Sequence, residues 1–339
     1  MSLSRPVLTD VARIAGVSPM TVSNVMNGKA VVAESTRRKV LDAAESIGYV
    51  PNIAARGLAR GRTNLIGVIS HDLTVQYAWS IVQGITNELA DEGVELLLSV
   101  TYQDASREVE RIRFLTSGLV DGVILIAPAL EPEALTVLAS SRVPAVVIDP
   151  RRLDVPLPRV IADNYAGARS AVDHLTSLGH RRIAIIDGDA SFDSAAERHR
   201  GYADGLLAAG ITPDPALTAV GDFTQSRGFA AALELLDQPL PPTAIFATAD
   251  VSAMGAVDAA RSLGLDVPRD LSVVGFDDIP QSAQSFPALT TVRQPLEVMG
   301  HRAVRMLIDL IDGGAATPDP VRLPTELVVR ETVSPARTL

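Results

Sequence analysis

The sequence predicts a protein in two parts: a small all-α head, followed by an α/β core of two doubly wound parallel-sheet lobes. Residues 8–28 have the pattern of two short helices separated by a turn that contains glycine. From Leu65 onward, short apolar segments alternate with helical stretches in two successive sets. Such alternation is typical of parallel sheets that helices cover on both faces. The length of 339 residues suits about two to three domains.

The first two helices of the head have clear signals. Ser18 is a good N-cap for the second helix, and Pro19 suits the first helical position, where no backbone N–H is needed. Facing apolar stripes are expected from Val11, Ile14 and Ala15 on the first helix and from Val22 and Val25 on the second. This layout is that of a helix-turn-helix, whose second helix enters the major groove of DNA.

A third helix is predicted over residues 34–46. It ends before Gly48, because glycine readily adopts the left-handed conformation that follows many helices. Val40, Ala44 and Ile47 are expected to pack on the first two helices.

A short fourth helix is predicted over residues 52–60, after a break at Pro51. Asn52 would be its cap and Gly61 its stop. A helix of this length is not stable alone in water. We therefore expect it to order only against DNA or a partner.

The core is predicted from its buried strands and the helices between them. The first set of strands is Leu65–Ser70, Glu95–Thr101, Gly122–Ala127 and Ala145–Ile148, and the second is Ile183–Asp187, Ala244–Thr248 and Ser272–Phe276. Helices are expected over 79–92, 106–115, 166–178, 195–209, 226–236 and 251–263. Two sets of strands indicate two similar lobes, with a boundary near residues 160–163.

Charge is divided unevenly along the chain. Residues 1–62 hold nine basic and four acidic residues, a net charge of +5, whereas the remainder holds 21 basic and 36 acidic residues, a net charge of −15. A basic head on an acidic body indicates that only the head meets phosphate. A chance asymmetry of the surface is the alternative explanation.

Several classes of protein are disfavoured by composition. Cysteine is absent, which excludes disulfides and cysteine-based metal sites, and no apolar run approaches the roughly 18 residues of a membrane span. No signal-peptide pattern begins the chain, so we expect the cytoplasm. The five histidines lack metal-ligand spacing, and no Walker loop, nucleophile elbow or dinucleotide fingerprint is present. We therefore expect no metal, no cofactor, no enzymatic activity and no membrane partner.

Seven segments of the chain, in this order, resemble the LacI/GalR family of transcriptional regulators. They are DVARIAGVSPMTVSNVMNG, GYVPNIAARGLARGRTNLIGVI, DNYAGA at 163–168, LGHRRIAII at 178–186, AAERHRGY at 195–202, VVGFDDIP at 273–280 and LTTVRQPLEVMG at 289–300. The resemblance covers nearly the whole chain. It implies a DNA-binding head, a hinge helix and a two-lobed core like that of periplasmic sugar-binding proteins. It also implies a homodimer that reads a pseudo-palindromic operator.

These expectations divide the chain into three parts. Residues 1–50 form the helix-turn-helix domain, residues 51–62 the hinge helix and linker, and residues 63–339 the two-lobed effector-binding and dimerisation core. Within the core, the N-terminal lobe takes about 63–161 and 291–322, and the C-terminal lobe about 162–290 and 323–332.

The resemblance implies that Pro19, Met20 and Asn24 occupy the positions that read bases. Met20 suits contact with a thymine methyl group, and Asn24 suits bidentate pairing with adenine. A phosphate contact or a solvated side chain is the alternative for Asn24, and capping is favoured over base reading for Pro19. The expected phosphate ligands are Thr21, Ser23, Asn27 and Arg37.

The resemblance also implies that Leu58 of the hinge helix is a wedge that enters a base step in the minor groove. Such a wedge unstacks the step and kinks the duplex. Packing of Leu58 against the core is the alternative. Ala55 and Ala59 leave room for two hinge helices to approach closely, and Asn52 completes the predicted contacts with DNA.

An effector between two such lobes would contact the loops that follow the strands. The candidates are His71, Asp72, Tyr77, Asp149, Arg198, Phe223, Asp250 and Asp277. By resemblance, Arg198 and Asp277 form a polar clamp and Phe223 a stacking platform. Arginine with carboxylates suits vicinal hydroxyls, because each oxygen can accept from one and donate to the other. The alternative is a structural salt bridge beside a core phenylalanine.

Three other residues have open assignments. The single tryptophan, Trp79, is expected in the core or in a dimer interface rather than in a ligand stack. Asp163 and Asn164 are expected to cap a loop rather than to touch the ligand.

The sequence thus predicts a dimeric transcriptional regulator, favoured as a repressor, whose operator affinity is controlled by a small molecule. A sugar is the first candidate for that molecule, and a purine or nucleoside is the second. A solute-binding protein with the same core, or an enzyme built on it, are the other classes left open.

Overall fold

The structure of the chain is a computed structural model that describes residues 6–27, 31–50, 62–73, 76–152, 154–315 and 319–337. It divides into two compact units, residues 1–63 and residues 64–339, which are considered separately. The predicted hinge helix and its residues Asn52, Ala55, Leu58 and Ala59 lie outside the described residues. Among the described helices, none has the length and apolar character needed to cross a bilayer.

The first unit contains the helix-turn-helix that the sequence predicts. It consists of α1 (Leu8–Ala15), α2 (Pro19–Met26) and α3 (Glu34–Ser46). The turn after α1 uses Gly16 with a φ of 66°, and the Ser18 hydroxyl caps α2 by accepting from the Thr21 amide at 3.1 Å. The three helices bury a small core that includes Val11, Val22, Val25, Val40 and Ala44.

Two helix starts in this unit have weak caps. The side chain of Val7 makes no capping hydrogen bond, and the Asp10 carboxylate instead accepts from the Val7 amide at 3.1 Å. Ala33 likewise gives α3 no side-chain cap. Ile14, expected in the apolar stripe of α1, is about half exposed because the core closes over Val11 on the neighbouring face.

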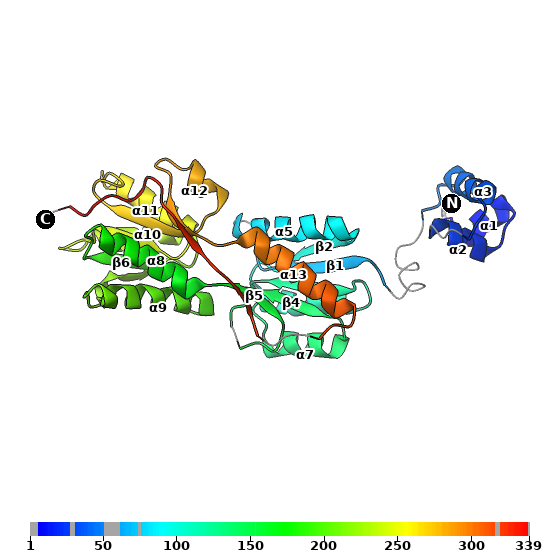
Figure 1. The fold of residues 1–339 in the computed structure, drawn as a ribbon, viewed down its shortest axis with the longest axis horizontal. Coiled ribbons are helices and arrows are strands. Elements are labelled where there is room, and N and C mark those ends of the chain that lie inside the picture. Colours follow the sequence, from blue (N-terminus) through cyan, green and yellow to red (C-terminus); the bar gives the residue numbers. More distant parts are fainter. Residues whose placement is uncertain are drawn as a thin grey trace. The chain divides into compact units, whose positions relative to one another are not determined.

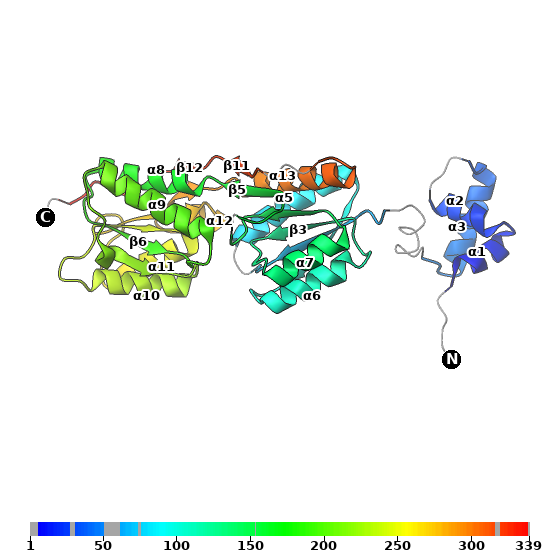
Figure 2. The same ribbon diagram turned by 90° about the horizontal axis from the view of Figure 1, so that it is seen from below.

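The first lobe of the second unit is a six-stranded parallel sheet in the order β11-β5-β4-β3-β1-β2 (Figure 1). Its strands are β1 (Leu65–Ser70), β2 (Glu95–Val100), β3 (Gly122–Ile126), β4 (Ala145–Ile148), β5 (Arg159–Ala162) and β11 (Val321–Leu323). Its helices are α5 (Gln76–Glu92), α6 (Ala105–Thr116), α7 (Pro132–Ser141) and α13 (Leu296–Ile311). Helices α5 and α13 cover one face of the sheet, and α6 and α7 cover the other (Figure 2).

The second lobe repeats this plan with the order β12-β10-β9-β8-β6-β7, where only β12 runs antiparallel to its neighbour. Its strands are β6 (Ile183–Asp187), β7 (Thr218–Val220), β8 (Ala244–Ala247), β9 (Ser272–Asp277), β10 (Thr290–Arg293) and β12 (Glu326–Val328). Its helices are α8 (Asn164–Ser177), α9 (Asp193–Ala208), α10 (Gln225–Leu236), α11 (Asp250–Ser262) and α12 (Pro280–Gln284), with a 3-10 turn η1 at Pro215–Leu217. Helices α8 and α9 pack on one face and α10 and α11 on the other (Figure 2).

The chain crosses between the lobes three times, after β5, after β10 and after β11. Because β10 belongs to the second sheet, the return to the first lobe follows Arg293 rather than residue 291, the boundary expected from sequence. A bidentate ion pair bridges the lobes at the last crossing: Arg322 of β11 donates to both carboxylate oxygens of Glu197 on α9, at 3.1 Å each.

All seven predicted strands are present with at most one residue of difference at an end. The five strands that the sequence analysis did not identify, β5, β7, β10, β11 and β12, have three or four residues each. Runs this short leave little apolar periodicity to detect. Trp79 is 54% exposed on α5, which excludes the core, and its placement in a dimer interface stays a prediction.

Candidate functional site

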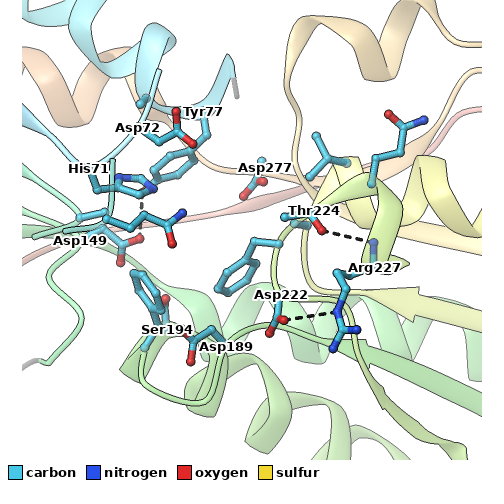
Figure 3. Close-up of a pocket in the computed structure, with 18 of the residues that line it drawn as sticks. His71, Asp72, Tyr77, Asp149, Asp189, Ser194, Asp222, Thr224, Arg227 and Asp277 are labelled. Atoms are coloured by element: carbon cyan, nitrogen blue, oxygen red, sulfur yellow. Dashed lines mark hydrogen bonds and ion pairs between the residues drawn. The ribbon is translucent and has the colours of Figure 1, made fainter. Parts of the chain in front are cut away.

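A cavity of about 760 Å³ lies between the two lobes of the second unit (Figure 3). Loops at the carboxyl ends of parallel strands from both lobes form its walls, as in other open α/β sheets. Seven of the eight predicted effector contacts line it: His71, Asp72, Tyr77 and Asp149 from the first lobe, and Arg198, Phe223 and Asp277 from the second. The structure therefore brings together residues that are up to two hundred positions apart in the chain.

Arg198 of α9 is the central cation of this cavity, and its side chain is 4% exposed. Its Nε donates to Asn164 Oδ1 at 2.8 Å, and one Nη donates to the carbonyl oxygen of Thr248. The same nitrogen lies 3.8 Å from Asp277 Oδ1. A buried guanidinium is tolerated only with such partners. Asn164 thus positions Arg198 and Asp163 caps the helix α8 by accepting from the Ala166 amide, where the sequence predicted that both would cap a loop.

Asp277 ends β9 with a φ of 122°, an unfavourable backbone conformation for a residue with a Cβ atom. Its Oδ1 accepts from the Gln294 side-chain amide at 2.7 Å, on the second crossing between the lobes. Burial raises the pKa of Asp277, and the charge of Arg198 opposes that rise. Strain and burial of this kind are held in place by the surrounding bonds and are common at ligand sites.

The first lobe contributes a tyrosine–carboxylate pair. The Tyr77 hydroxyl donates to Asp149 Oδ2 at 2.8 Å, and burial raises the pKa of the Asp149 carboxyl. His71 stands nearby with its pKa lowered by burial. Its buried Nδ1 has no hydrogen-bond partner among the described residues. The wall therefore offers a neutral imidazole, a phenol and a carboxylate to a polar ligand.

Asp250 was expected to contact the effector, and the structure corrects this. It is fully buried at the start of α11 and does not line the cavity. Its carboxylate accepts from the Ile279 amide and from the hydroxyls of Ser282 and Thr291. The side chain turns toward α12 and β10, so Asp250 holds the loop that follows Asp277 instead of facing a ligand.

Phe223 lines the cavity with its ring partly exposed, which agrees with a platform rather than a core residue. Its backbone has a φ of 54°, and the ring of Phe192 lies edge-on at 5.7 Å between centroids. Gly188 leaves the space for this ring, because a Cβ atom there would lie 1.9 Å from the Phe223 Cζ. The sequence analysis did not single out Phe192, although its place after β6 follows the same positional rule.

Most residues of the cavity rim were not predicted from the sequence. The other lining residues are Ala78, Gln103, Ala127, Asp189, Ser194, Asp222, Thr224, Gln225, Arg227, Ala249 and Val251. The lining as a whole contains five aspartates and two arginines, so its electrostatic potential is negative at neutral pH.

The recognition helix of the head presents a small polar surface. Met20 is 69% exposed, and Pro19 stands at the first helical position without an N–H. The Thr21 hydroxyl bonds that of Ser18 at 2.9 Å, and the Asn27 amide donates to Ser23 at 3.3 Å. Arg37 lies 3.6 Å from Glu34 on α3, and Asn24 is half-buried on α2. These residues stay candidate DNA contacts.

Comparisons with known proteins find one family match in each of the two units. The family described as bacterial regulatory proteins, lacI family, matches residues 7–52, and a periplasmic binding protein-like domain matches residues 172–333. The HTH-type transcriptional regulator CelR of Thermobifida fusca is 37% identical over 336 residues, 96% of this chain and 98% of that protein. The repressor CytR of Escherichia coli (strain K12) is 34% identical and covers 95% of each chain.

Solved structures of transcription regulators are also similar to this chain. The lac repressor dimer bound to operator has a TM-score of 0.87 at 32% identity, and covers 98% of this chain and 100% of its own. The CelR–cellobiose complex has a TM-score of 0.75 at 35% identity, with 97% and 100% covered. A helix-turn-helix head joined to a two-lobed ligand-binding core defines a DNA-binding transcription regulator. The chain belongs to the LacI family of these regulators.

Proposed function

We propose that this regulator is a repressor whose affinity for its operator is set by a neutral carbohydrate bound between the two lobes. The observation that carries the proposal is the enclosure of Arg198, Asp277 and Asp149 in one cavity beside Phe223. A sugar hydroxyl both donates and accepts, so it can donate to a carboxylate while accepting from the guanidinium. An aromatic ring suits the apolar C–H face of a pyranose.

The relatives support this choice of ligand class. CelR was solved in complex with cellobiose, and a LacI-family regulator from Enterococcus faecium was solved with bound ribose. The repressors PurR and CytR are also similar, at 33% and 34% identity. A purine or nucleoside stays the competing ligand class, as in the sequence prediction. All of these relatives regulate transcription, and we propose that this cavity likewise binds its ligand without converting it.

Control of DNA binding would follow from a binding site whose walls come from both lobes. A ligand that contacts Tyr77 and Asp149 on one lobe and Arg198 and Asp277 on the other favours one arrangement of the lobes. We propose that this arrangement sets the spacing of the two hinge segments in a homodimer. Leu58, Ala55, Ala59 and Asn52 would then meet the minor groove of operator DNA in the cytoplasm, while Met20 and Asn24 read the major groove.

The test uses the full-length protein and a duplex that the protein itself selects from a random pool. Fluorescence anisotropy measures operator affinity with neutral sugars, nucleosides and purines added in turn. We expect a neutral carbohydrate to change operator affinity about 5- to 150-fold, since typical coupling energies are about 1–3 kcal/mol. The Asp277→Asn variant should lose this response while keeping its affinity for DNA without ligand.

The control is Asp173→Asn, which changes an exposed carboxylate on α8. It should respond to the carbohydrate as the unaltered protein does. A response to nucleosides alone, or a full carbohydrate response in Asp277→Asn, would contradict the proposed ligand class.

A further inference from the structure

We infer that the cavity holds two hydroxyl-binding subsites at different depths, so that the effector is a neutral carbohydrate of at least two linked rings. This inference rests on the proposed carbohydrate function. It assigns Arg227 and Asp222, with Gln103 across the mouth, to an outer subsite.

The inner subsite is the buried pair of Arg198 and Asp277. Their side chains are 4% and 8% exposed, and the atoms Nη1 and Oδ1 lie 3.8 Å apart. Hydrogen bonds join Arg198 to Asn164 and Thr248 and join Asp277 to Gln294, so this ion pair is held still. One ring of a ligand that reached this depth would be surrounded by protein.

The outer subsite repeats the same chemistry near solvent. Arg227 Nε lies 3.5 Å from Asp222 Oδ2, and both side chains line the same cavity while remaining about half exposed. In Figure 3 the two side chains point toward each other beside Thr224. The Thr224 hydroxyl accepts from the Arg227 amide and so fixes the first turn of α10. A guanidinium beside a carboxylate again suits vicinal hydroxyls.

Phe223 connects the two subsites. It follows Asp222 directly in the chain, and the ring centroid lies 5.9 Å from the Arg198 Cζ atom. Asp222 and Phe223 both have left-handed backbone, with φ values of 48° and 54°. This conformation turns the two residues in different directions. The Asp222 carboxylate joins the outer pair, and the Phe223 ring lies beside the inner pair.

The first lobe also reaches the mouth of the cavity. Gln103 is exposed, lines the cavity and adopts a φ of 62°. Its amide can donate to and accept from a hydroxyl. A ligand that contacts Gln103 and Arg227 therefore touches both lobes at the rim, in addition to the inner contacts.

Size and charge favour a neutral two-ring carbohydrate. The cavity volume of about 760 Å³ is in the upper part of the roughly 300–1,000 Å³ range of ligand pockets. Five carboxylates face two guanidiniums, each already beside a carboxylate, so an anionic sugar would be repelled.

The test compares matched ligands by calorimetry on the full-length protein. The probes are glucose, galactose and xylose, the disaccharides cellobiose, maltose, lactose and xylobiose, and the nucleosides cytidine and adenosine. We expect one disaccharide to bind at least tenfold more tightly than each of its own monosaccharides. The Arg227→Ala variant should weaken that disaccharide about tenfold, a loss of about 1.4 kcal/mol, and change monosaccharide binding less than twofold.

Arg113→Ala is the matched control, because Arg113 forms an equally exposed ion pair with Glu133 and does not line the cavity. It should leave both affinities unchanged. Equal affinity for a monosaccharide and its disaccharide, or an equal loss for both in Arg227→Ala, overturns the outer subsite and leaves the carbohydrate proposal standing. Binding of nucleosides alone, or of no probe, removes both.

Discussion

The wall that the second lobe gives to the cavity is bonded much more densely than the wall from the first lobe. Arg198 has two hydrogen bonds and an ion pair, and Asp277 is also held by Gln294. On the first lobe, the Tyr77–Asp149 hydrogen bond joins two side chains across the cavity wall. Groups fixed before binding lose less entropy when a ligand arrives. The second lobe should therefore supply most of the affinity for the effector. The first lobe should undergo most of the conformational change when the two lobes close around the effector.

The two lobes also differ in the buried side chains that lie behind the cavity walls. Asp250, buried under the second-lobe wall, accepts three hydrogen bonds from α12, β10 and the loop between β9 and α12. A buried carboxylate also serves the first lobe: Glu108 on α6 accepts from two backbone amides of the loop after β3. Each lobe thus uses a buried acid to hold a loop at the sheet edge, but the second lobe adds a layer of fixed side chains in front.

The largest effect is expected from Arg198→Met, which removes the cation of the second-lobe wall. Asp277 would stay buried without its partner, and such losses cost about 3–5 kcal/mol. Urea unfolding should show this decrease, and calorimetry should show at least a hundredfold loss of effector affinity. Arg200→Met, on the same helix but exposed, should change the free energy of unfolding by less than about 0.5 kcal/mol. Effector affinity within threefold of normal in Arg198→Met would contradict the central role of this residue.

Asp250→Ala tests the layer behind the wall. The Ile279 amide and two buried hydroxyls would lose their acceptor, at a cost of about 2–4 kcal/mol in the free energy of unfolding. Effector affinity should fall less than in Asp277→Asn, because Asp250 does not line the cavity. If Asp250→Ala reduced the free energy of effector binding more than the free energy of unfolding, Asp250 would be part of the binding site.

The position of Asp250 shows what the sequence could and could not predict. Its place directly after β8 is the position at which parallel strands deliver ligand contacts, and seven other residues chosen by similar reasoning do line the cavity. The direction of its side chain depends on where Ser282 and Thr291 lie, and these are over thirty residues away in sequence. Periodicity found the long buried strands because their apolar runs are continuous.

The rim was missed for a different physical reason. Gln103, Asp222 and Phe223 depend on left-handed backbone at residues other than glycine, which no local pattern indicates. Phe223 was among the candidates chosen by loop position, and only its role as a stacking platform came from the family resemblance. Arg227 reaches the cavity from the first turn of α10 rather than from a strand end. The inner site is thus predictable from topology, whereas the specificity of the mouth depends on loop conformation.

The pH dependence of effector binding tests the buried carboxylates of the two walls, Asp149 in the first lobe and Asp277 in the second. Burial raises the pKa of both Asp149 and Asp277 above the ordinary 3.8. The folded state therefore holds these protons to higher pH than the unfolded chain. Their contribution to stability is largest below the unfolded value and is lost as the pH rises through the raised values. Effector affinity should change in the opposite direction, because an ionised carboxylate accepts more strongly from sugar hydroxyls than a protonated carboxyl group does.

Calorimetry from neutral pH down to about pH 5 should show affinity falling, at most by roughly tenfold per pH unit and per group. Asp149→Asn and Asp277→Asn should each remove only part of this slope. A slope that vanishes in either single variant would assign the whole titration to one wall. An affinity that does not change with pH in the unaltered protein would contradict the need for ionised carboxylates.

The smallest effect is expected from Tyr77→Phe, which removes the hydroxyl that joins the first-lobe pair. Asp149 loses one hydrogen bond but can recruit water or a ligand hydroxyl, so the free energy of unfolding should fall by about 1 kcal/mol or less. Effector affinity should fall about three- to tenfold by calorimetry. Tyr102→Phe, an exposed tyrosine outside the cavity lining, should change neither quantity. If Tyr77→Phe cost as much affinity as Arg198→Met, the first-lobe wall would have to be as rigidly prepared for the ligand as the second. In that case, closure of a mobile first-lobe wall onto a rigid second-lobe wall could not explain the control of operator binding. The motion of the lobes would need another cause.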